Sequence, residues 1–443
     1  MELRDYQKEL IRDIRKSITE GNHRIMVQSP PRSGKTVVMA HIAKSATDKG
    51  NRVLFFSHRK EINEQVATTF ERNEVDLSLV EIGGVQSLVR KLDKLDEPTI
   101  ILIDEAHHSK AKSYVKIINY FPKAFVFMFT GTPVRLNGDG FDDIADDLII
   151  GKSVKWLQEH GNIAPFKYYA PSVIDTSKLK KRAGEFTNDS IDESMKKVAY
   201  GDIINHYERL AKGQQAIVYT HNVESAERVA SEFNSYGYHA VAISGKTPKS
   251  EREKAMQSFR NGSLQIMVNC ELFTEGIDLP NVDVCIMLRP TQSLSLYLQF
   301  AMRPLNPREG KTAIIIDHVG NVERFGLPND DREWTLKGEV KQKQISKLGE
   351  PTTRVCEECF ATFWSSERVC PICQHENQPT KAELEIIKEI ELEEIQQALT
   401  QKIQTFVTPD QCRTMEELVE YKNQHGYKNG WVWHMSKKLN IYK

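Results

Sequence analysis

The chain has 443 residues, of which 40% are hydrophobic and 27% are charged, and its formal net charge is −1. This length predicts two to four domains, and the composition is typical of a globular protein. No apolar run approaches the ~20 residues of a membrane span, and no signal-peptide core follows Met1, which favours an intracellular protein without a membrane partner. The near-zero charge excludes a uniformly basic surface, but it allows a local basic cleft for nucleic acid.

Short apolar runs alternate with amphipathic stretches in residues 1–150. The runs are 24–28, 53–56, 99–103 and 125–129. Continuous apolarity is typical of parallel strands that helices cover on both faces. We therefore predict an α/β domain with a doubly wound parallel sheet over residues 1–150.

A second block of the same kind spans residues 206–330. Its strand candidates are 216–219, 240–243, 265–268, 284–288 and 313–316. Residues 151–205 are polar and mixed, and we interpret them as a connector that carries some helix. The fold class predicted for residues 1–330 is thus two tandem doubly wound parallel-sheet domains.

A phosphate-binding turn is the first candidate site. Ser33, Gly34, Lys35 and Thr36 directly follow the first apolar run. Backbone amides at a helix N-terminus bind anionic oxygens, lysine reaches the β- and γ-phosphates, and the Thr36 hydroxyl can ligate Mg²⁺. The general P-loop pattern has glycine where Ser29 stands, so the tetrapeptide alone could be a chance helix start.

A pair of acids after the third apolar run strengthens the case for a nucleotide site. Asp104 and Glu105 follow residues 99–103. A carboxylate at the end of a strand can hold Mg²⁺, and its neighbour can polarise the water that attacks the γ-phosphate. Together with the turn at 33–36, this order predicts ATP hydrolysis.

Seven short strings, taken in order, resemble the motifs of the superfamily-2 DEAD/DEAH-box helicases of the phage replication type. They are LRDYQ at 3–7, FSHRKE at 56–61, GVQSL at 84–88, DEAH at 104–107, FTGTPVR at 129–135, IVYTHN at 217–222 and FTEGIDLP at 273–280. The resemblance covers about residues 1–325. It implies two RecA-like domains that bind one ATP between them and a nucleic-acid strand across them.

The resemblance also implies roles for individual residues. Gln7 is expected to read adenine, and the other expected nucleotide contacts are Arg4, Arg32, Ser33, Gly34, Lys35, Thr36, Gly276, Asp278 and Arg303. The expected catalytic residues are Lys35, Asp104, Glu105, His107 and Arg303, with His107 and Thr132 relaying the nucleotide state. The expected nucleic-acid contacts are Arg59, Gln86, Ser87, Arg135, His221 and Thr274, and these are mostly contacts to phosphate.

The chain departs from the helicase pattern at two places. Arg32 stands where the family usually has glycine, and its side chain could contact phosphate or point into solvent. In the string QFAMRPLN at 299–306, the family expects glycine at Met302 and arginine at Asn306. The arginine that is absent at 306 normally stabilises charge on the γ-phosphate. We expect Arg303 to take this role, with Arg308 in reserve.

Two Cys-x-x-Cys pairs predict a structural zinc site in residues 345–380. Cys356 with Cys359, and Cys370 with Cys373, are separated by ten residues. Each pair can turn two thiolates toward one tetrahedral ion. The aromatic residues Phe360, Phe363 and Trp364 are expected to form the small core of this zinc ribbon.

The tail, residues 381–443, has two parts. Residues 381–402 are acidic and have the apolar spacing of one helix face. The last stretch interleaves aromatic residues with lysines, which is compatible with a base-stacking surface or with a small helical domain that has Trp431 and Trp433 in its core. We favour the helical domain.

These features together predict an ATP-dependent DNA helicase or translocase that uses ATP, Mg²⁺ and Zn²⁺. By resemblance, it works in phage or prophage replication or recombination in the cytoplasm of a bacterial host. Replication proteins are possible partners of the C-terminal region. The alternatives left open are an RNA helicase, a duplex translocase that does not separate strands, and an ATP-gated DNA-binding or loader module with weak hydrolysis.

Overall fold

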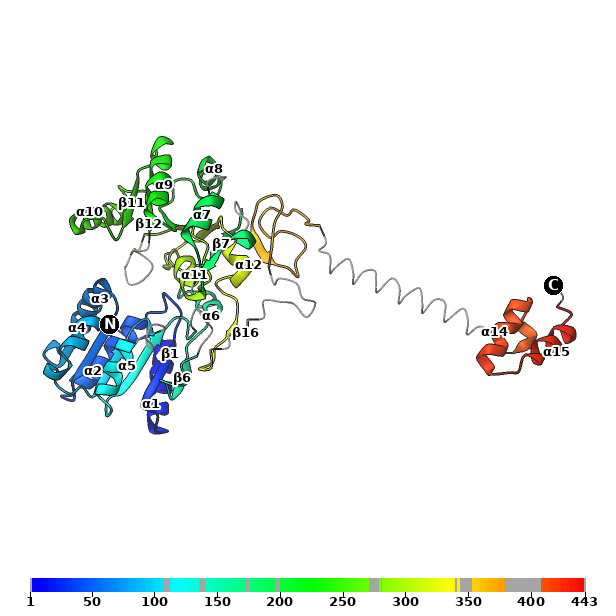
Figure 1. Cartoon of the computed structure of the whole chain (residues 1–443), viewed down its shortest axis with the longest axis horizontal. Helices are drawn as coiled ribbons and strands as arrows, with labels where there is room; N and C mark the ends of the chain where they lie inside the picture. Colours follow the sequence, from blue (N-terminus) through cyan, green and yellow to red (C-terminus); the bar gives the residue numbers. More distant parts are fainter. Residues whose placement is uncertain are drawn as a thin grey trace. The chain divides into compact units, whose positions relative to one another are not determined.

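A computed structural model describes residues 2–106, 112–134, 140–171, 176–182, 184–195, 200–270, 279, 281–338, 341–342, 353–378 and 408–441. The chain divides into two compact units, residues 1–377 and 378–443 (Figure 1). The first unit contains two six-stranded parallel sheets, which we call sheet A and sheet B. The second unit contains a small helical module.

Sheet A has the strand order β3-β2-β4-β5-β1-β6 and is parallel throughout. The strands are β1 (Arg24–Gln28), β2 (Val53–Ser57), β3 (Val80–Gly84), β4 (Ile100–Ile103), β5 (Phe125–Thr130) and β6 (Asp147–Ile150). The helices are α1 (Asp5–Thr19), α2 (Lys35–Thr47), α3 (Lys60–Arg72), α4 (Val85–Arg90) and α5 (Lys112–Tyr120), with 3-10 turns at Leu77–Leu79 and Leu92–Lys94.

Both faces of sheet A are buried, as its apolar runs predict. Ile25 and Val27 belong to one buried cluster, whereas Met26 between them belongs to a cluster on the other face. Because successive strand side chains point to opposite faces, a continuous apolar run supplies both clusters.

Sheet B repeats this design with the order β11-β12-β10-β13-β14-β7. Its strands are β7 (Phe166–Tyr169), β10 (Ala216–Thr220), β11 (Ala240–Ser244), β12 (Ile266–Cys270), β13 (Val284–Met287) and β14 (Ala313–Asp317). The helices of this part are α6 (Val154–Glu159), α7 (Asn188–Met195), α8 (Tyr200–Ala211), α9 (Val223–Ser235), α10 (Lys249–Arg260), α11 (Leu294–Ala301) and α12 (Asn321–Phe325). Two short hairpins, β8 (Lys181–Arg182) with β9 (Glu185–Phe186) and β15 (Arg332–Glu333) with β16 (Lys341–Gln342), complete it.

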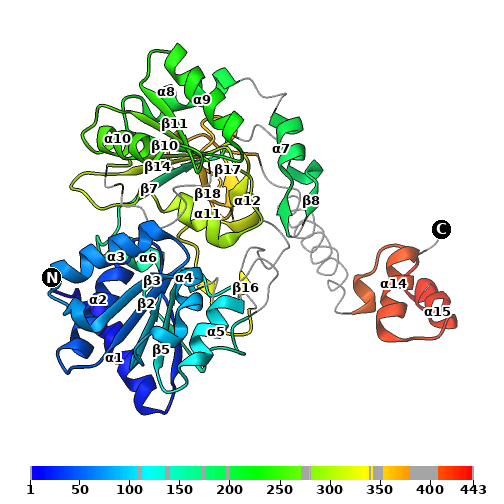
Figure 2. The same cartoon turned by 60° about the vertical axis from the view of Figure 1, so that its left-hand side comes forward.

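The predicted connector contributes more than helix. Its β7 pairs with β14 as the edge strand of sheet B, with Phe166 opposite Ala313. The cysteine segment continues from this edge: β17 (Thr353–Val355) pairs with β18 (Thr362–Trp364), and Ala361 bridges to Tyr169 of β7 (Figure 2). The cysteine segment is therefore attached to the second sheet domain.

Two expected core aromatic residues lie elsewhere. Phe363 is buried, but Trp364 is exposed on β18. Phe360 is half-buried and packs on His206, with the Arg209 guanidinium 5.1 Å from its ring centre. The ribbon is too small to enclose three aromatic side chains, and one of them instead packs on α8.

The second unit contains α14 (Met415–His425) and α15 (Gly430–Lys438), preceded by a 3-10 turn at Pro409–Gln411. Its buried core consists of Cys412, Leu418, Tyr421, Val432 and Met435. Trp431 packs against this core, whereas Trp433 is exposed, so the expectation of both tryptophans in the core is wrong for Trp433. The predicted acidic helix at 381–402 lies outside the described residues.

Candidate nucleotide and nucleic-acid sites

The turn between β1 and α2 has the geometry of an anion cradle. The Ser29 amide donates to Thr130 of β5 at 2.9 Å, and the Ser33 hydroxyl donates to the Pro30 carbonyl at 2.6 Å. Gly34 has φ 80° and immediately precedes α2, which begins at Lys35. The turn thus presents backbone amides at the N-terminus of a long helix, where anionic oxygens bind.

Two acids face this turn from the end of β4. The Lys35 Nζ lies 3.6 Å from a carboxylate oxygen of Glu105, and both side chains are at most 13% exposed. Asp104 is buried, and its carboxylate accepts a hydrogen bond from the Glu105 amide at 2.9 Å. Glu105 has φ 50°, a left-handed conformation that is unusual for a residue with a side chain. The structure therefore brings the predicted lysine and acid pair together.

The N-terminal element holds the turn from behind. The Gln7 Nε2 donates to the Ser33 carbonyl at 3.2 Å, and its Oε1 accepts from the Arg4 amide at 3.0 Å. The φ of 80° at Gly34 explains the glycine, since a side chain there would be strained, and a Cβ atom would also lie 2.5 Å from this Nε2 and displace it. Tyr6, which the sequence did not single out, donates its hydroxyl to the Ser33 carbonyl at 2.8 Å.

The adenine-reading expectation for this element gains no support from these contacts. Both ends of the Gln7 amide already bind protein atoms, so adenine would have to replace one of them. The Arg4 guanidinium donates a hydrogen bond to the Asn162 side chain at 2.9 Å. Gln7 acts here as a support for the phosphate turn.

Met302 and Asn306, the two residues of the string 299–306 that depart from the family pattern, both have structural contacts. Met302 is fully buried in one cluster with Tyr6 and Leu305, so its side chain fills apolar space against α1 where the family has glycine. The side-chain Nδ2 of Asn306 donates to the Leu279 carbonyl at 3.2 Å. Asn306 thus has a structural contact within the second domain and supplies no cation.

The two arginines of this region differ in environment. Arg303 is buried beside Tyr219: burial raises the pKa of the Tyr219 hydroxyl to about 12, and the Arg303 guanidinium opposes this shift. Arg308 forms an ion pair with Asp283 in the same domain. The structure therefore gives no support to Arg308 as a reserve, since its guanidinium is already held by a carboxylate.

Arg32 reaches from the phosphate turn to the second domain. It has φ 68°, and its Nη2 donates to the Arg303 carbonyl at 3.2 Å. Burial is the main cause that lowers the pKa of Lys311, and the positive charge of Arg32 is a smaller cause in the same direction. Of the two orientations that the sequence left open for Arg32, the structure shows a side chain that spans the domain boundary.

A groove of about 620 Å³ opens at the ends of β2 and β3, and it contains two of the expected nucleic-acid contacts, Gln86 and Ser87. It is lined by His58, Lys60, Asn63, Gly84, Val85, Gln86, Ser87, Arg90, Ser113 and Tyr114. Arg59 adjoins it, with its Nε 3.2 Å from the His58 ring. Arg90 was missed, although its position four residues after Gln86 on α4 places it on the same helix face.

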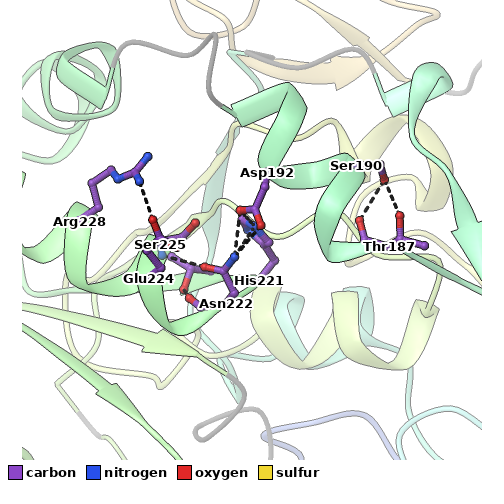
Figure 3. Close-up of polar contacts among 9 residues, drawn as sticks. Thr187, Ser190, Asp192, His221, Asn222, Glu224, Ser225 and Arg228 are labelled. Carbon is purple, nitrogen blue, oxygen red and sulfur yellow. Dashed lines mark hydrogen bonds and ion pairs between the residues drawn. The ribbon is translucent and has the colours of Figure 1, made fainter.

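His221 cannot contact a strand directly in this conformation. Its side chain is 1% exposed, and its Nε2 lies 2.7 Å from the Asp192 carboxylate of α7. Asn222 donates to the same carboxylate, and its Oδ1 accepts from Ser225 at the start of α9, as Figure 3 shows. Burial lowers the pKa of His221, and Asp192 opposes this shift. The network joins the connector to the second sheet, and a nucleic-acid contact by His221 would first require this buried ring to become exposed.

Several expected site residues lie outside the described residues. They are His107, Arg135, Thr274, Gly276 and Asp278. Thr132 is described: it is buried, and its amide donates to the Thr130 hydroxyl at 3.1 Å. The segment after β5 therefore turns back onto Thr130, the residue whose carbonyl accepts from the Ser29 amide.

The four cysteines fit a tetrahedral metal. All four sulfurs lie within 4.8 Å of one another, with Cys356 to Cys373 at 3.6 Å and Cys359 to Cys370 at 3.7 Å. Zinc–sulfur bonds of 2.3 Å give a tetrahedron with an edge of about 3.8 Å, so these spacings fit one Zn²⁺. The residues after each pair, Phe360 and Gln374, have φ 63° and 64°, which shows that the two turns share one geometry.

We predict that the purified chain contains one zinc ion and that Cys359→Ser lowers the zinc content and the melting temperature together. A structural zinc site contributes folding free energy directly, so its loss loosens the segment that packs on α8. Metal analysis and thermal unfolding measure the two effects. Cys412→Ser is the control, because Cys412 lies in the other unit; equal zinc in both variants would contradict the assignment.

Comparison with known proteins supports the class that this geometry indicates. The family described as type III restriction enzyme, res subunit, matches residues 1–86 and 80–135, and the helicase conserved C-terminal domain matches residues 175–306. A Lactococcus phage protein described as a 51.5 kDa protein is 41% identical over 371 residues, which are 82% of each chain. A Saccharomyces cerevisiae protein named as the ATP-dependent helicase IRC3 is 27% identical over 77% of this chain, which spans 57% of that protein.

A solved structure agrees with the fold. A fragment of an HsdR subunit of a type I restriction enzyme from Vibrio vulnificus superposes with a TM-score of 0.59 at 19% identity, covering 76% of this chain and 67% of that one. Two parallel sheets, with an acid pair facing the turn before α2, agree with the helicase-class families that match this chain. The chain belongs to the superfamily-2 helicases of the phage type, and it is an ATP-dependent nucleic-acid helicase by family. Within the described residues, no helix combines the length and the apolar character that crossing a bilayer requires.

Proposed function

We propose that the protein is a DNA-dependent ATPase that moves along DNA or unwinds it during phage or prophage replication or recombination, in the cytoplasm of a bacterial host. The observation that carries the proposal is the Lys35–Glu105 pair, buried at the end of sheet A and facing the phosphate turn. In this proposal Lys35 and the turn bind the ATP phosphates. Thr36 and Asp104 hold Mg²⁺, and Glu105 orients the attacking water.

The preference for DNA rests on the relatives. The res subunit and the HsdR subunit are both parts of restriction enzymes, and a type ISP restriction-modification enzyme of similar fold is described as bound to DNA. The phage relative is matched over 82% of its length, which supports a phage setting. The groove beside Gln86 and Ser87 suits the sugar-phosphate backbone of one strand, because its basic and amide side chains can contact phosphate without reading sequence.

A side-by-side measurement of phosphate release tests the proposal. We expect single-stranded or forked DNA to stimulate ATP hydrolysis more than RNA of the same sequence. Arg90→Ala should raise the DNA concentration needed for half-maximal stimulation, because one groove cation is removed. Arg72→Ala serves as the control, since Arg72 lies at the end of α3 that does not line the groove. Stronger stimulation by RNA would favour the RNA helicase. Stimulation by DNA without strand separation, measured in a parallel strand-displacement assay, would favour a duplex translocase.

A further inference from the structure

We infer that the exposed face of α15 in the C-terminal module is a second binding surface for single-stranded nucleic acid, separate from the groove of the first sheet domain. The surface consists of Trp433, His434, Lys437 and Lys438, which we call the α15 face. It goes beyond the proposed motor function, since nothing in the ATP site requires it.

The spacing along α15 places these residues together. Positions 433, 434, 437 and 438 follow the three- and four-residue steps of one helix face, and all four are exposed. On the opposite side of the helix, Val432, Met435 and Ser436 are buried against the core of the module. The helix thus separates cleanly into a packed side and an open side.

Trp433 is the unexpected residue on this face. It is 62% exposed, more than any other large apolar side chain among the described residues. An indole of this size usually contributes to a core or an interface, and the core of this module is completed by other residues. The Lys437 ammonium lies 3.9 Å from the indole ring centre, so a cation and an aromatic plane are already placed side by side.

The charges of the module favour a polyanion as the occupant. From Tyr421 to Ile441 the chain has four lysines and neither aspartate nor glutamate. The acids of the module, Asp410, Glu416, Glu417 and Glu420, all precede this segment. An aromatic plane among lysines suits a strand whose bases stack and whose phosphates pair, because stacking tolerates any base. An apolar protein partner would match the indole but leave the lysines facing it without anions.

The test compares two triple variants of the full-length protein. One replaces the α15 face, Trp433→Ser with Lys437→Gln and Lys438→Gln. The matched control changes an exposed apolar residue and two charges on α14, Val419→Ser with Glu416→Gln and Glu420→Gln. Binding to fluorescent oligothymidine without nucleotide is measured over a range of salt concentrations.

We expect the α15 variant to bind about tenfold more weakly, since one stacked base and two phosphate contacts are lost. The slope of log affinity against log salt should become shallower by roughly 1.4, at about 0.7 for each phosphate contact on a single strand. Trp433→Phe with both lysines kept should bind within about twofold of wild type, because a phenyl ring still stacks. Affinity and slope equal to wild type in the α15 variant would overturn the inference.

ATP hydrolysis distinguishes this inference from the motor proposal. At saturating DNA, the α15 variant should hydrolyse ATP at the wild-type maximal rate, because the ATP site is unchanged. If wild type shows no DNA-stimulated hydrolysis, the motor proposal fails while the binding measurement still decides the α15 face. Retained helical signal and melting temperature in both triple variants show that the module is folded.

Discussion

Glu105→Gln should lower DNA-stimulated ATP hydrolysis by about 10³-fold, within the range that a positioned acid or base contributes to proton transfer. The amide has nearly the same shape, so the turn after β4 should keep its geometry. The glutamine amide cannot accept a proton from the attacking water, and it cannot orient that water as a carboxylate does. Steady-state phosphate release at saturating DNA measures the effect.

The ATP affinity should respond differently from the rate. In the structure Glu105 neutralises Lys35 at 3.6 Å, and this ion pair must separate before Lys35 can bind phosphate. Glu105→Gln removes the competing charge from a site where both side chains are at least 87% buried, so ATP should bind at least as tightly as in wild type. Retained binding with lost hydrolysis would assign Glu105 to the chemical step.

Glu97→Gln is the matched control, since Glu97 is exposed at the opposite end of β4. Its rate should stay within about twofold of wild type, as is usual for a surface substitution far from the site. If wild type hydrolyses ATP no faster than Glu105→Gln, the ATP-gated DNA-binding module with weak hydrolysis becomes the better interpretation. That module remains an alternative because Asn306 supplies no cation.

The central strands were predictable from sequence because each is a continuous apolar run. Within the two six-stranded sheets, three strands were missed: β3, β6 and β7. β3 ends in Gly83 and Gly84, and none of its residues is fully buried. Each of the three lies at the edge of its sheet and pairs with only one other strand of that sheet, so an unbroken apolar run is not required.

The candidate site was predictable only where it depends on one local motif. Lys35 and Glu105 are placed by strand ends of the same sheet, so their meeting followed from the sequence order. The burial of Met302 beside Tyr6 and the burial of His221 beside Asp192 depend on packing between distant segments. No spacing rule relates those segments in the sequence. The packing of their side chains in the fold determines that Met302 and His221 are buried.

Arg32→Gly should lower the maximal rate of ATP hydrolysis by about 10²-fold or more without lowering stability. We propose that Arg32, rather than the Arg303 expected from the sequence, supplies the cation that is absent at Asn306. Its guanidinium already spans the domain boundary to the Arg303 carbonyl at 3.2 Å, and Arg303 itself is buried beside Tyr219. A cation at the γ-phosphate contributes roughly 10³–10⁵ in rate in related motors, so its partial loss should be large.

The backbone at residue 32 makes glycine an informative replacement. With φ 68°, arginine is held in a conformation that costs a residue with a Cβ about 1 kcal/mol, whereas glycine adopts it freely. Arg32→Gly should therefore keep or raise the melting temperature while the rate falls. A slower enzyme that is equally stable cannot be explained by misfolding.

Restoring the family's arginine gives the decisive comparison. Asn306→Arg in the Arg32→Gly background should recover at least about tenfold of the lost rate, because the second domain then supplies the cation that the first domain has lost. Asn306→Gln in the same background is the control, since it can still donate to the Leu279 carbonyl but carries no charge. A rate for Arg32→Gly within about threefold of wild type, or equal recovery by glutamine and arginine, would show that Arg32 is not the substitute cation.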